Sequence, residues 1–437
     1  MEINKVLLVY CFLLFYSCTH AQEVIVENWQ NAITELPESK DPTSAELWLK
    51  DRLDNSKHFE KYTNPNGIET YVLKTHLAQQ QSTMYFATPS ITSDGRYMWF
   101  WLQEENKNSL ALIDFEKDEV VRYADMKIAE SSSVVDTITG DVYWVEPRGS
   151  QRHITDFYRL YKRTPGEDGT ISVINRIPHF VDNCKPPRQV VTHLIFSADR
   201  KRFCFDSGHY YANNKSYLGT VSLDGSPAEL WTTLDRRYNH AQMNPKYNDV
   251  MLAVQDYFYD YQGQYGETGS KIPIENRMWI IYRDGESKPV FPVGNDIYHE
   301  WWDATGDILW YIDKKGNYGG KGVCRVSYDY ESRSFGEPEL IWPNSLGHAE
   351  SDSQSRYLVA DHGHKTFESK NTVRVSFFNI STGKEVDIIT SMPYPGWNAD
   401  PHPHFALQDR IVCFTFSKAE GSTVGISFTG TLRELTK

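Results

Sequence analysis

Apolar and polar residues follow one another along this chain in a phrase that returns about every fifty residues. In each copy a short polar turn leads into a strand-like run of aromatic and aliphatic residues. The copies are SDGRYMWF at 93–100, ITGDVYWV at 138–145, SADRKRFCF at 197–205, NPKYNDVMLAV at 244–254, DATGDILWYI at 303–312, DSQSRYLVA at 352–360 and ALQDRIVCFTF at 406–416. Short strands and polar turns at such a period are typical of a β-propeller with four strands to a blade. The pattern predicts an all-β fold, a seven-bladed β-propeller.

The period also sets the expected domains. A chain of 437 residues has room for two or three ordinary domains, but a closed ring of blades takes up residues 66–437 as one. Residues 22–65 form a lead segment with a short helix, because the capping residues DPTS precede AELWLKDRL, whose apolar residues have helical spacing. At the far end GSTVGISFTGTLREL supplies a last strand, and we expect the two chain ends to pair and close the ring.

Residues 1–21 have the character of an export leader. Lys5 precedes the apolar run 6–16, which is too short for a permanent membrane helix. Two processing sites are open: cleavage after Ala21, as in an ordinary signal peptide, and lipidation of Cys18 in the lipoprotein-like phrase LFYSC. Both predict an exported protein, either in the periplasm or tethered to the outer membrane through a lipid on Cys18.

The composition narrows the choice of partner. A net charge of −13 argues against nucleic acid and anionic membranes, because phosphate binding needs a basic surface. A small anionic ligand stays compatible, since one cationic pocket is hidden in the sum over the chain. The 12 Trp and 27 Tyr suit both stacked blades and sugar binding, so they do not separate the two. Beyond the leader, Cys184, Cys204, Cys324 and Cys413 have neither CxxC spacing nor the pattern of a disulfide framework.

Histidines stand at a similar place in five copies of the phrase, shortly before the polar turn. They are His193, His240, His299, His348 and His402, the last followed by His404. Because the loops that lead into the inner strands converge at the axis of a propeller, we expect these imidazoles to lie close together. A scaffold with one hydrogen-bonding histidine per blade is the alternative. The contexts differ, as in VVTHLIF, IYHEWWD and LGHAESD, and varied contexts at a shared position favour a functional site.

Longer phrases around these histidines resemble a known family. YNHAQMNPKYNDVMLAVQ, NRMWIIYRDG, YHEWWDATGDILWYI, LGHAESDSQSRYLVADHG and DPHPHFALQDRIVCFTF are similar, in order and spacing, to the oligogalacturonate lyases, propeller enzymes that cleave short pectic uronides. The resemblance covers about residues 70–425 and is strongest from residue 238 onward. It implies a histidine base in a His-Glu-aromatic phrase and an arginine on the substrate carboxylate. It also implies a divalent, manganese-like metal held by three histidines and a glutamine.

Three of these positions carry over directly. The base matches His299 of HisGluTrpTrp, the carboxylate-binding arginine matches Arg277 of ArgMetTrp, and the first metal histidine matches His348. The structural alternative for Arg277 is a surface arginine stacked on Trp279. Near these groups, His240, Gln242, His193 and Trp301 are candidates for contact with the sugar, or else they only order their blades.

The remaining metal ligands belong to a Gln-x-x-His-Pro-His phrase, from which this sequence departs. Direct matching selects His402 and His404, with Ala399 in place of the glutamine. If the phrase is instead aligned without a gap relative to the strand that follows it, its two histidine positions fall on Asp400 and His402, and Trp397 stands in place of the glutamine. We prefer the ungapped register, because a slip by one residue turns the side chains of a strand to the wrong face. His404 then replaces Asp400 as a ligand or supports one by a hydrogen bond.

These residue types suit a β-elimination. An arginine fork neutralises the uronate carboxylate, a cation stabilises the enolate-like charge, and a neutral imidazole removes the C5 proton. Two imidazoles and a carboxylate are compatible with manganese, zinc or iron, although Asp400 is also explained as a turn residue before Pro401.

The sequence therefore predicts a metal-assisted lyase for uronic-acid-containing oligosaccharides, with Mn²⁺ as the expected cofactor. Three alternatives stay open. The substrate is a rhamnosyl-glucuronate linkage of the ulvan type; or the propeller only binds glycans; or a pair of acids such as Asp400 and Glu300 makes it a hydrolase.

Overall fold

The computed structural model describes residues 42–104, 107–128, 132–146, 157–166, 169–180, 191–208, 215–256, 258–259, 271–292, 297–344, 346–362, 372–394 and 400–437. They belong to one compact unit, Ser39–Lys437. The leader with Cys18, and also Cys184, Trp397 and Ala399, lie outside the described residues. Among the residues described, no helix is long and apolar enough to span a bilayer.

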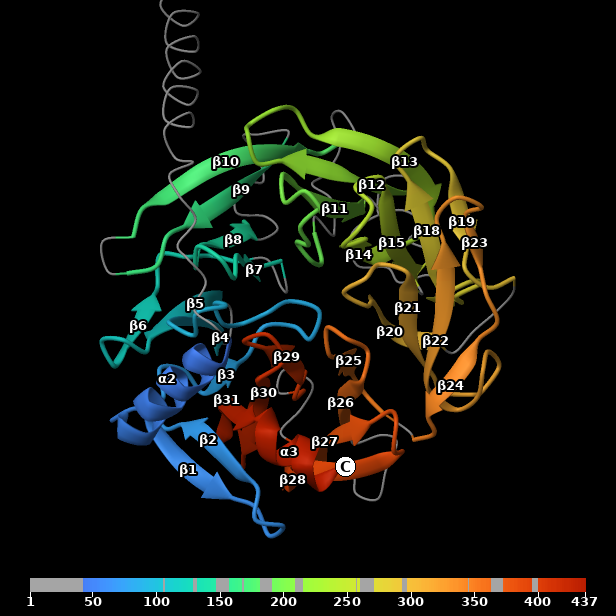
Figure 1. Cartoon of the computed structure of the whole chain (residues 1–437). Coiled ribbons are helices and arrows are strands. Elements are labelled where there is room, and N and C mark those ends of the chain that lie inside the picture. The colour runs from blue at the N-terminus through green and yellow to red at the C-terminus, as the bar shows by residue number, and fades with distance from the viewer. Residues whose placement is uncertain are drawn as a thin grey trace, which may run out of the picture. The chain divides into compact units, whose positions relative to one another are not determined.

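The described chain is nearly all β, and its sheets follow one another around a ring in chain order (Figure 1). The first and last parts of the chain share a nine-stranded sheet of β1 (Phe59–Thr63), β2 (Glu69–Leu73), β3 (Gln80–Ser82), β4 (Tyr97–Glu104), β5 (Lys107–Asp114), β6 (Glu119–Tyr123), β29 (His404–Ala406), β30 (Ile411–Lys418) and β31 (Gly421–Phe428). A four-stranded sheet follows, of β7 (Val134–Val135), β8 (Val142–Val145), β9 (Phe157–Arg163) and β10 (Ile171–Pro178). The next has three strands, β11 (Arg202–Gly208), β12 (Lys215–Ser222) and β13 (Glu229–Asp235).

The second half of the ring has three further sheets of four or five strands. One has four strands, β14 (Tyr238–Met243), β15 (Val250–Gln255), β18 (Met278–Tyr282) and β19 (Ser287–Pro289), with the two-stranded sheet β16 (Phe258–Tyr259) and β17 (Lys271–Ile272) between β15 and β18 in the chain. The next has five strands, β20 (Ile297–Trp302), β21 (Ile308–Asp313), β22 (Gly322–Asp329), β23 (Ser334–Phe335) and β24 (Glu339–Trp342). The last has four, β25 (Ala349–Ser351), β26 (Tyr357–His362), β27 (Thr372–Asn379) and β28 (Lys384–Pro393).

The chain ends meet in one sheet. Strand β2 pairs antiparallel with β31, so that Tyr71 lies opposite Ile426. Strand β3 pairs with β31 at a single parallel position, Gln80 with Ser422. The closure expected from the sequence is therefore present, and the sheet begins at Phe59, earlier than the expected boundary at residue 66. The reason is that β1 and β2 form a hairpin that completes the C-terminal sheet and leaves no edge of β31 open.

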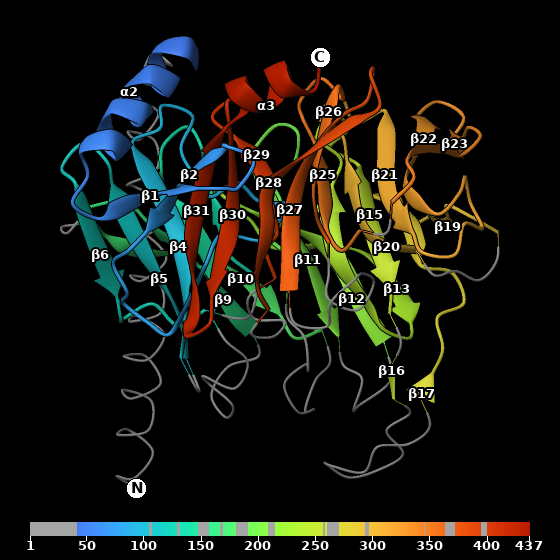
Figure 2. The ribbon, with the colours of Figure 1, turned by 90° about the horizontal axis from the view of Figure 1, so that it is seen from below.

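Two helices lie at one end of the ring (Figure 2). Helix α2 (Pro42–Asn55) buries Ala45, Leu49 and Leu53, which are four residues apart and so lie on one face. This face packs against the core between the first and last strands of the chain. Helix α3 (Thr429–Leu435) follows β31 directly.

The recurring polar phrases join neighbouring sheets. The side-chain amide of Asn244 donates to the carbonyl oxygen of Gly306 at 2.8 Å, and the backbone N–H of Asp199 donates to Asn248 Oδ1 at 2.9 Å. Gly306 has φ +71°, and a Cβ there would lie 2.4 Å from Asn244 Oδ1, so only glycine fits. In these two cases the recurring turn supplies a hydrogen bond to a neighbouring sheet.

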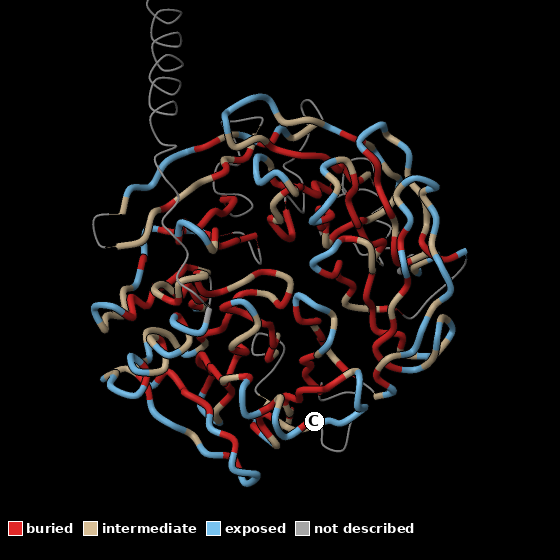
Figure 3. The backbone as a smooth tube through the Cα atoms, in the orientation of Figure 1, coloured by how far each residue is buried: buried red, intermediate tan, exposed pale blue. Residues whose placement is uncertain are grey.

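The core lies between the faces of adjacent sheets, and the exposed residues gather at the turns (Figure 3). Trp342 on β24 stacks on Phe378 on β27, with ring centroids 4.8 Å apart. Large aromatic rings fill the space between two sheets in this way. This packing fixes the inner strands, which carry the site described next.

Candidate functional site

Three histidines at the centre of the ring share the same left-handed backbone conformation. His240 on β14, His299 on β20 and His402 before β29 have φ values of +51°, +52° and +44°. In β14 and β20 the strand register shifts at this residue. A bulge of this kind re-aims a side chain, and its left-handed backbone is unusual for a residue with a Cβ. The repeat thus places an imidazole at the same position in several sheets.

The five histidines that share a sequence phase do lie close together. Ring centroids of His299 and His348 are 4.0 Å apart, and those of His348 and His402 are 4.2 Å apart. On the other side, His193 and His240 are 5.0 Å apart. The expected convergence of these imidazoles is present in the structure.

A tyrosine that no sequence pattern singled out lies between the two histidine groups. The ring of Tyr85 stacks on His193 with centroids 4.4 Å apart, and it lies 4.9 Å from His402 and 6.0 Å from His240. Tyr85 follows β3 in the first sheet, in the phrase STMYF. The segment from β3 to β6 contains no histidine, so the histidine pattern did not point to this part of the chain.

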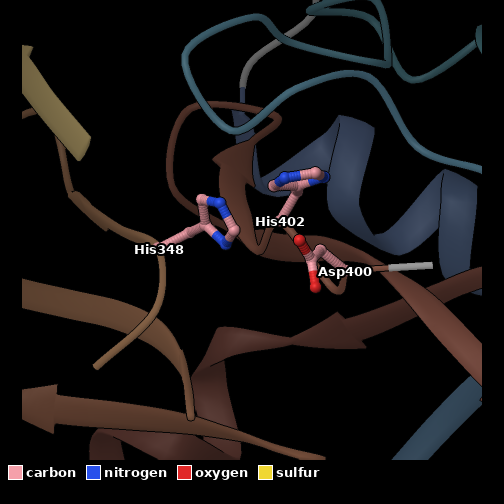
Figure 4. Close-up of side chains that lie close together, drawn as sticks. All are labelled: His348, Asp400 and His402. Carbon is pink, nitrogen blue, oxygen red and sulfur yellow. The ribbon is translucent and has the colours of Figure 1, made fainter. Parts of the chain in front are cut away.

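One group of side chains has the composition of a metal site. His348, Asp400 and His402 each offer a ligand atom, and these atoms lie within 4.8 Å of one another. Figure 4 shows the two imidazoles and the carboxylate turned toward a common space. Two nitrogen donors and one oxygen donor fit a divalent ion such as manganese, zinc or iron. This grouping agrees with the ungapped register, which selected Asp400 and His402.

Asp361, at the end of β26, supports this group. Its Oδ2 lies 2.9 Å from Nδ1 of His348, and its Oδ1 accepts the backbone N–H of His348 at 2.8 Å. Oδ2 also accepts the backbone N–H of His402 at 3.3 Å. When Nδ1–H of His348 donates to the carboxylate, Nε2 keeps its lone pair for a metal. One carboxylate therefore orients two residues of the group.

The pKa values of the two imidazoles are shifted in opposite directions. Burial alone would lower the pKa of His348, but the charge and hydrogen bond of Asp361 raise it on balance. The pKa of His402 is well below its ordinary value, because of burial and the nearby His348 and His404. His402 is neutral at pH 7, as a metal ligand must be.

His404 does not belong to the metal group. It lies on β29, fully buried, and its Nδ1 is 3.1 Å from the carbonyl oxygen of His402, to which it can donate a hydrogen bond. Burial lowers the pKa of His404 to about 4. The structure thus groups three of the four residues expected at the metal, and the fourth supports the backbone of His402.

His299 has the properties of a neutral base. Its Nδ1–H donates to the carbonyl oxygen of Gly347 in a short hydrogen bond, which leaves Nε2 with a lone pair. Burial lowers its pKa well below the ordinary value, and the positive charges of His348, Lys314 and Arg277 lower it further. Lys314 was not selected from the sequence, although it directly follows β21.

Arg277 is buried, so it is not the surface arginine of the alternative interpretation. Only 5% of its surface is exposed, and its guanidinium lies 5.7 Å from the ring of Tyr298. Nε is 3.5 Å from Glu300 Oε2, and a terminal nitrogen is 3.8 Å from Asp256 Oδ1. Glu300 also approaches His240 Nδ1 at 3.5 Å. The arginine is held from behind by carboxylates, which is the usual way to fix the direction of a buried guanidinium.

The residues expected to contact sugar are mostly buried. The side-chain amide of Gln242 donates to the carbonyl oxygen of Glu300 at 2.8 Å, and only 1% of His193 is exposed. Trp301 lies in the core beside Trp310, because the register shift in β20 turns it between the sheets. Of the four candidates, only His240 is half-buried.

His362 lies outside the central histidine group. His362 is buried, with its Nε2 2.9 Å from Ser376 Oγ and its Nδ1 3.2 Å from Arg374. It belongs to no metal group among the described residues. Its neighbour in the sequence, His364, lies outside the residues that the structure describes.

These features define an all-β, propeller-like protein with a histidine-rich site at the inner strands. No family model and no curated protein matches the chain. Solved structures do match. An oligogalacturonate lyase in complex with manganese has a TM-score of 0.63 and 14% identity, over 85% of this chain and 96% of that one. The oligogalacturonate lyase of Vibrio parahaemolyticus has a TM-score of 0.63 and 15% identity, over 87% of this chain and 98% of that one.

A third match is the β-propeller domain of the trilobed protease from Pyrococcus furiosus, with a TM-score of 0.48 and 11% identity, over 80% of this chain and 96% of that one. At such identities the likeness concerns the fold. The chain has the fold of the oligogalacturonate lyases, and the resemblance seen in the sequence is confirmed at that level.

Proposed function

We propose that this protein is a lyase that cleaves uronic-acid-containing oligosaccharides by metal-assisted β-elimination. The observation that carries the proposal is the position of His299. Its ring lies 4.0 Å from that of His348 in the metal group, and Arg277 is close enough for its charge to lower the pKa of His299. A neutral imidazole next to a cation site, with the positive charge of an arginine acting on it, suits the removal of a proton next to a carboxylate.

We propose that the ring has seven blades. The nine-stranded sheet counts as two of them, β3 to β6 and β29 to β31 with β1 and β2, because a single parallel residue pair joins them. The five other sheets of three or more strands supply the rest. The short sheet of β16 and β17 is an excursion between two strands of one blade.

Each side chain of the site has its own role in the proposed reaction. Arg277 binds the uronate carboxylate at the sugar that loses its proton, and His299 Nε2 takes the proton from C5. The C5–H electron pair becomes the new C4–C5 double bond, and the bond from C4 to the glycosidic oxygen breaks. His348, Asp400 and His402 would hold a divalent ion, which we propose is manganese; when bound, it would supply positive charge near the substrate carboxylate. Burial keeps His299 neutral before the reaction.

The hydrolase alternative has less support. Glu300 would have to act as a protonated acid beside Asp400. Burial would raise the pKa of Glu300, but Arg277 and His240 lower it on balance, so the carboxyl group is ionised at neutral pH. An ionised, fully buried carboxylate holds an arginine in place and cannot donate a proton.

The likeness to oligogalacturonate lyases favours oligogalacturonate as the substrate class, with rhamnosyl-glucuronate linkages as the second candidate. We also propose that the protein is exported, either after cleavage of a signal peptide or as a lipoprotein through Cys18. The test is ultraviolet absorbance of the unsaturated uronate product on pectic, ulvan and rhamnosyl-glucuronate oligomers. Product from one of these classes supports the proposal, and its absence on every uronide overturns it.

A further inference from the structure

An elimination needs a proton donor as well as a base. The glycosidic oxygen that leaves C4 is a poor leaving group unless it receives a proton as the bond breaks. His299 accepts a proton in the proposed reaction, and His348 and His402 are committed to the metal group. The donor must therefore be another group that borders the same space.

Tyr85 occupies that position. Its ring lies 4.9 Å from His402 and 6.1 Å from His348 on one side, and 6.0 Å from His240 on the other. Burial raises the pKa of its phenol well above the ordinary value, Glu300, Asp400 and Asp361 raise it further and Arg277 lowers it, so the phenol keeps its proton at neutral pH. The ring borders both histidine groups.

The orientation of this ring is fixed by packing. Tyr85 stacks on His193 at 4.4 Å with an interplanar angle of 16°, and its other neighbour is Phe86 at 4.5 Å. Its backbone carbonyl accepts the N–H of Thr88, so the residue begins a tight turn. A side chain stacked on one neighbour and in contact with another, yet half-buried at the centre of the ring, is preorganised for contact with a bound sugar.

We propose that Tyr85 is a catalytic residue that donates its phenolic proton to the leaving glycosidic oxygen. This inference rests on the proposed lyase function. As C5–H electrons form the double bond and the C4–O bond breaks, the oxygen takes the bond pair and the proton of Tyr85. The phenolate regains a proton from water, and the imidazolium of His299 returns its proton to water. Atoms and charge balance without any further reactant.

The test is Tyr85→Phe, which removes the hydroxyl and keeps the ring on His193. On a uronide with a sugar leaving group, turnover falls by at least about 100-fold while KM stays near the native value. On a synthetic uronide whose C4 leaving group is 4-nitrophenolate, which needs no proton, turnover stays within about threefold of native. Tyr97→Phe, a half-buried tyrosine in the same sheet and away from the site, is the matched control and retains both activities.

Other outcomes overturn the assignment in distinct ways. Equal loss on both substrates means that Tyr85 binds or positions the sugar without donating a proton. Full activity of Tyr85→Phe on both, with loss in His240→Gln on the sugar substrate alone, makes His240 the donor. If the native protein forms no unsaturated product from any uronide, the proposed function itself fails and this inference fails with it. A melting temperature and a metal content equal to those of the native protein show that the variant is folded.

Discussion

The carboxylate of Asp361 binds both the imidazole and the backbone N–H of His348, at 2.9 Å and 2.8 Å. The same carboxylate accepts the backbone N–H of His402 from the next sheet. Asp361 thus joins two of the three residues of the proposed metal site, although it is not one of them itself.

Replacing Asp361 by asparagine should weaken metal binding without abolishing it. Asparagine keeps an oxygen for one of the two backbone N–H groups but loses the second acceptor and the charge that orients the imidazole of His348. Substitutions of such supporting groups typically reduce metal affinity by about 10- to 100-fold. Titration of the apo-protein with Mn²⁺ by calorimetry measures this directly, and an affinity equal to that of the native protein would contradict the assigned role.

The metal group can be tested against the competing register of the histidine phrase. We expect His348→Ala, Asp400→Ala and His402→Ala to lose the metal that the native protein keeps after dialysis. His404→Gln should keep it, since His404 lies outside the group and donates to the carbonyl oxygen of His402. Elemental analysis of the purified proteins gives the result. If His404→Gln loses its metal and Asp400→Ala keeps it, the gapped register is the correct one.

A matched control separates metal loss from general damage to the protein. His58 is a half-buried histidine that binds Thr75 Oγ1 and the carbonyl oxygen of Asp118, far along the chain from the site. His58→Ala removes as many atoms as His348→Ala does. Its metal content should equal that of the native protein.

Arg277→Lys should reduce kcat/KM by about 10- to 100-fold, because lysine keeps the charge but cannot form the two parallel hydrogen bonds of a guanidinium to a carboxylate. The loss should be largest for substrates with an ionised carboxylate and small for their methyl esters. Steady-state kinetics on both substrate forms checks this. Arg283→Lys, at an exposed arginine paired with Glu229, is the control and should leave the kinetics unchanged. Equal losses on acid and ester would show that Arg277 does not bind the carboxylate.

Asp206 should make the protein less stable as the pH rises from about 4 to 7. Burial raises its pKa from 3.8 to about 7, against hydrogen bonds from Thr192 and Ala241. Between these values the folded state binds one more proton than the unfolded state, so the free energy of unfolding falls as pH increases, by up to about 1.4 kcal/mol per unit. Asp206→Asn should remove this contribution. Urea unfolding across the range measures the slope, and an unchanged slope in the variant would contradict the prediction.

Much of this arrangement could be predicted from the sequence, because the same sequence pattern recurs with each sheet. The polar phrases recur with the sheets, and His240, His299 and His402 recur with the left-handed residue of the inner strand. The supporting aspartates also occupy the same position in their repeats, since Asp206 ends the phrase RFCFD and Asp361 ends the phrase YLVAD. Each accepts backbone N–H groups from its own sheet and from the next.

What could not be predicted depends on packing between distant segments. Tyr85 comes from the first sheet and meets His193 only because the ring is closed. Trp301 follows the proposed base directly after Glu300, yet the shifted register in β20 places it in the core. Neither spacing nor periodicity reveals which side of a bulge faces the axis.

Bond cleavage at this site is expected to be an elimination. The most direct measurement is mass spectrometry of the products formed from a uronide in water labelled with heavy oxygen. A lyase gives fragments whose masses sum to that of the substrate, one of them unsaturated and neither carrying the label, and His299→Ala gives none. Fragments that gain one labelled water between them would show hydrolysis and contradict the account.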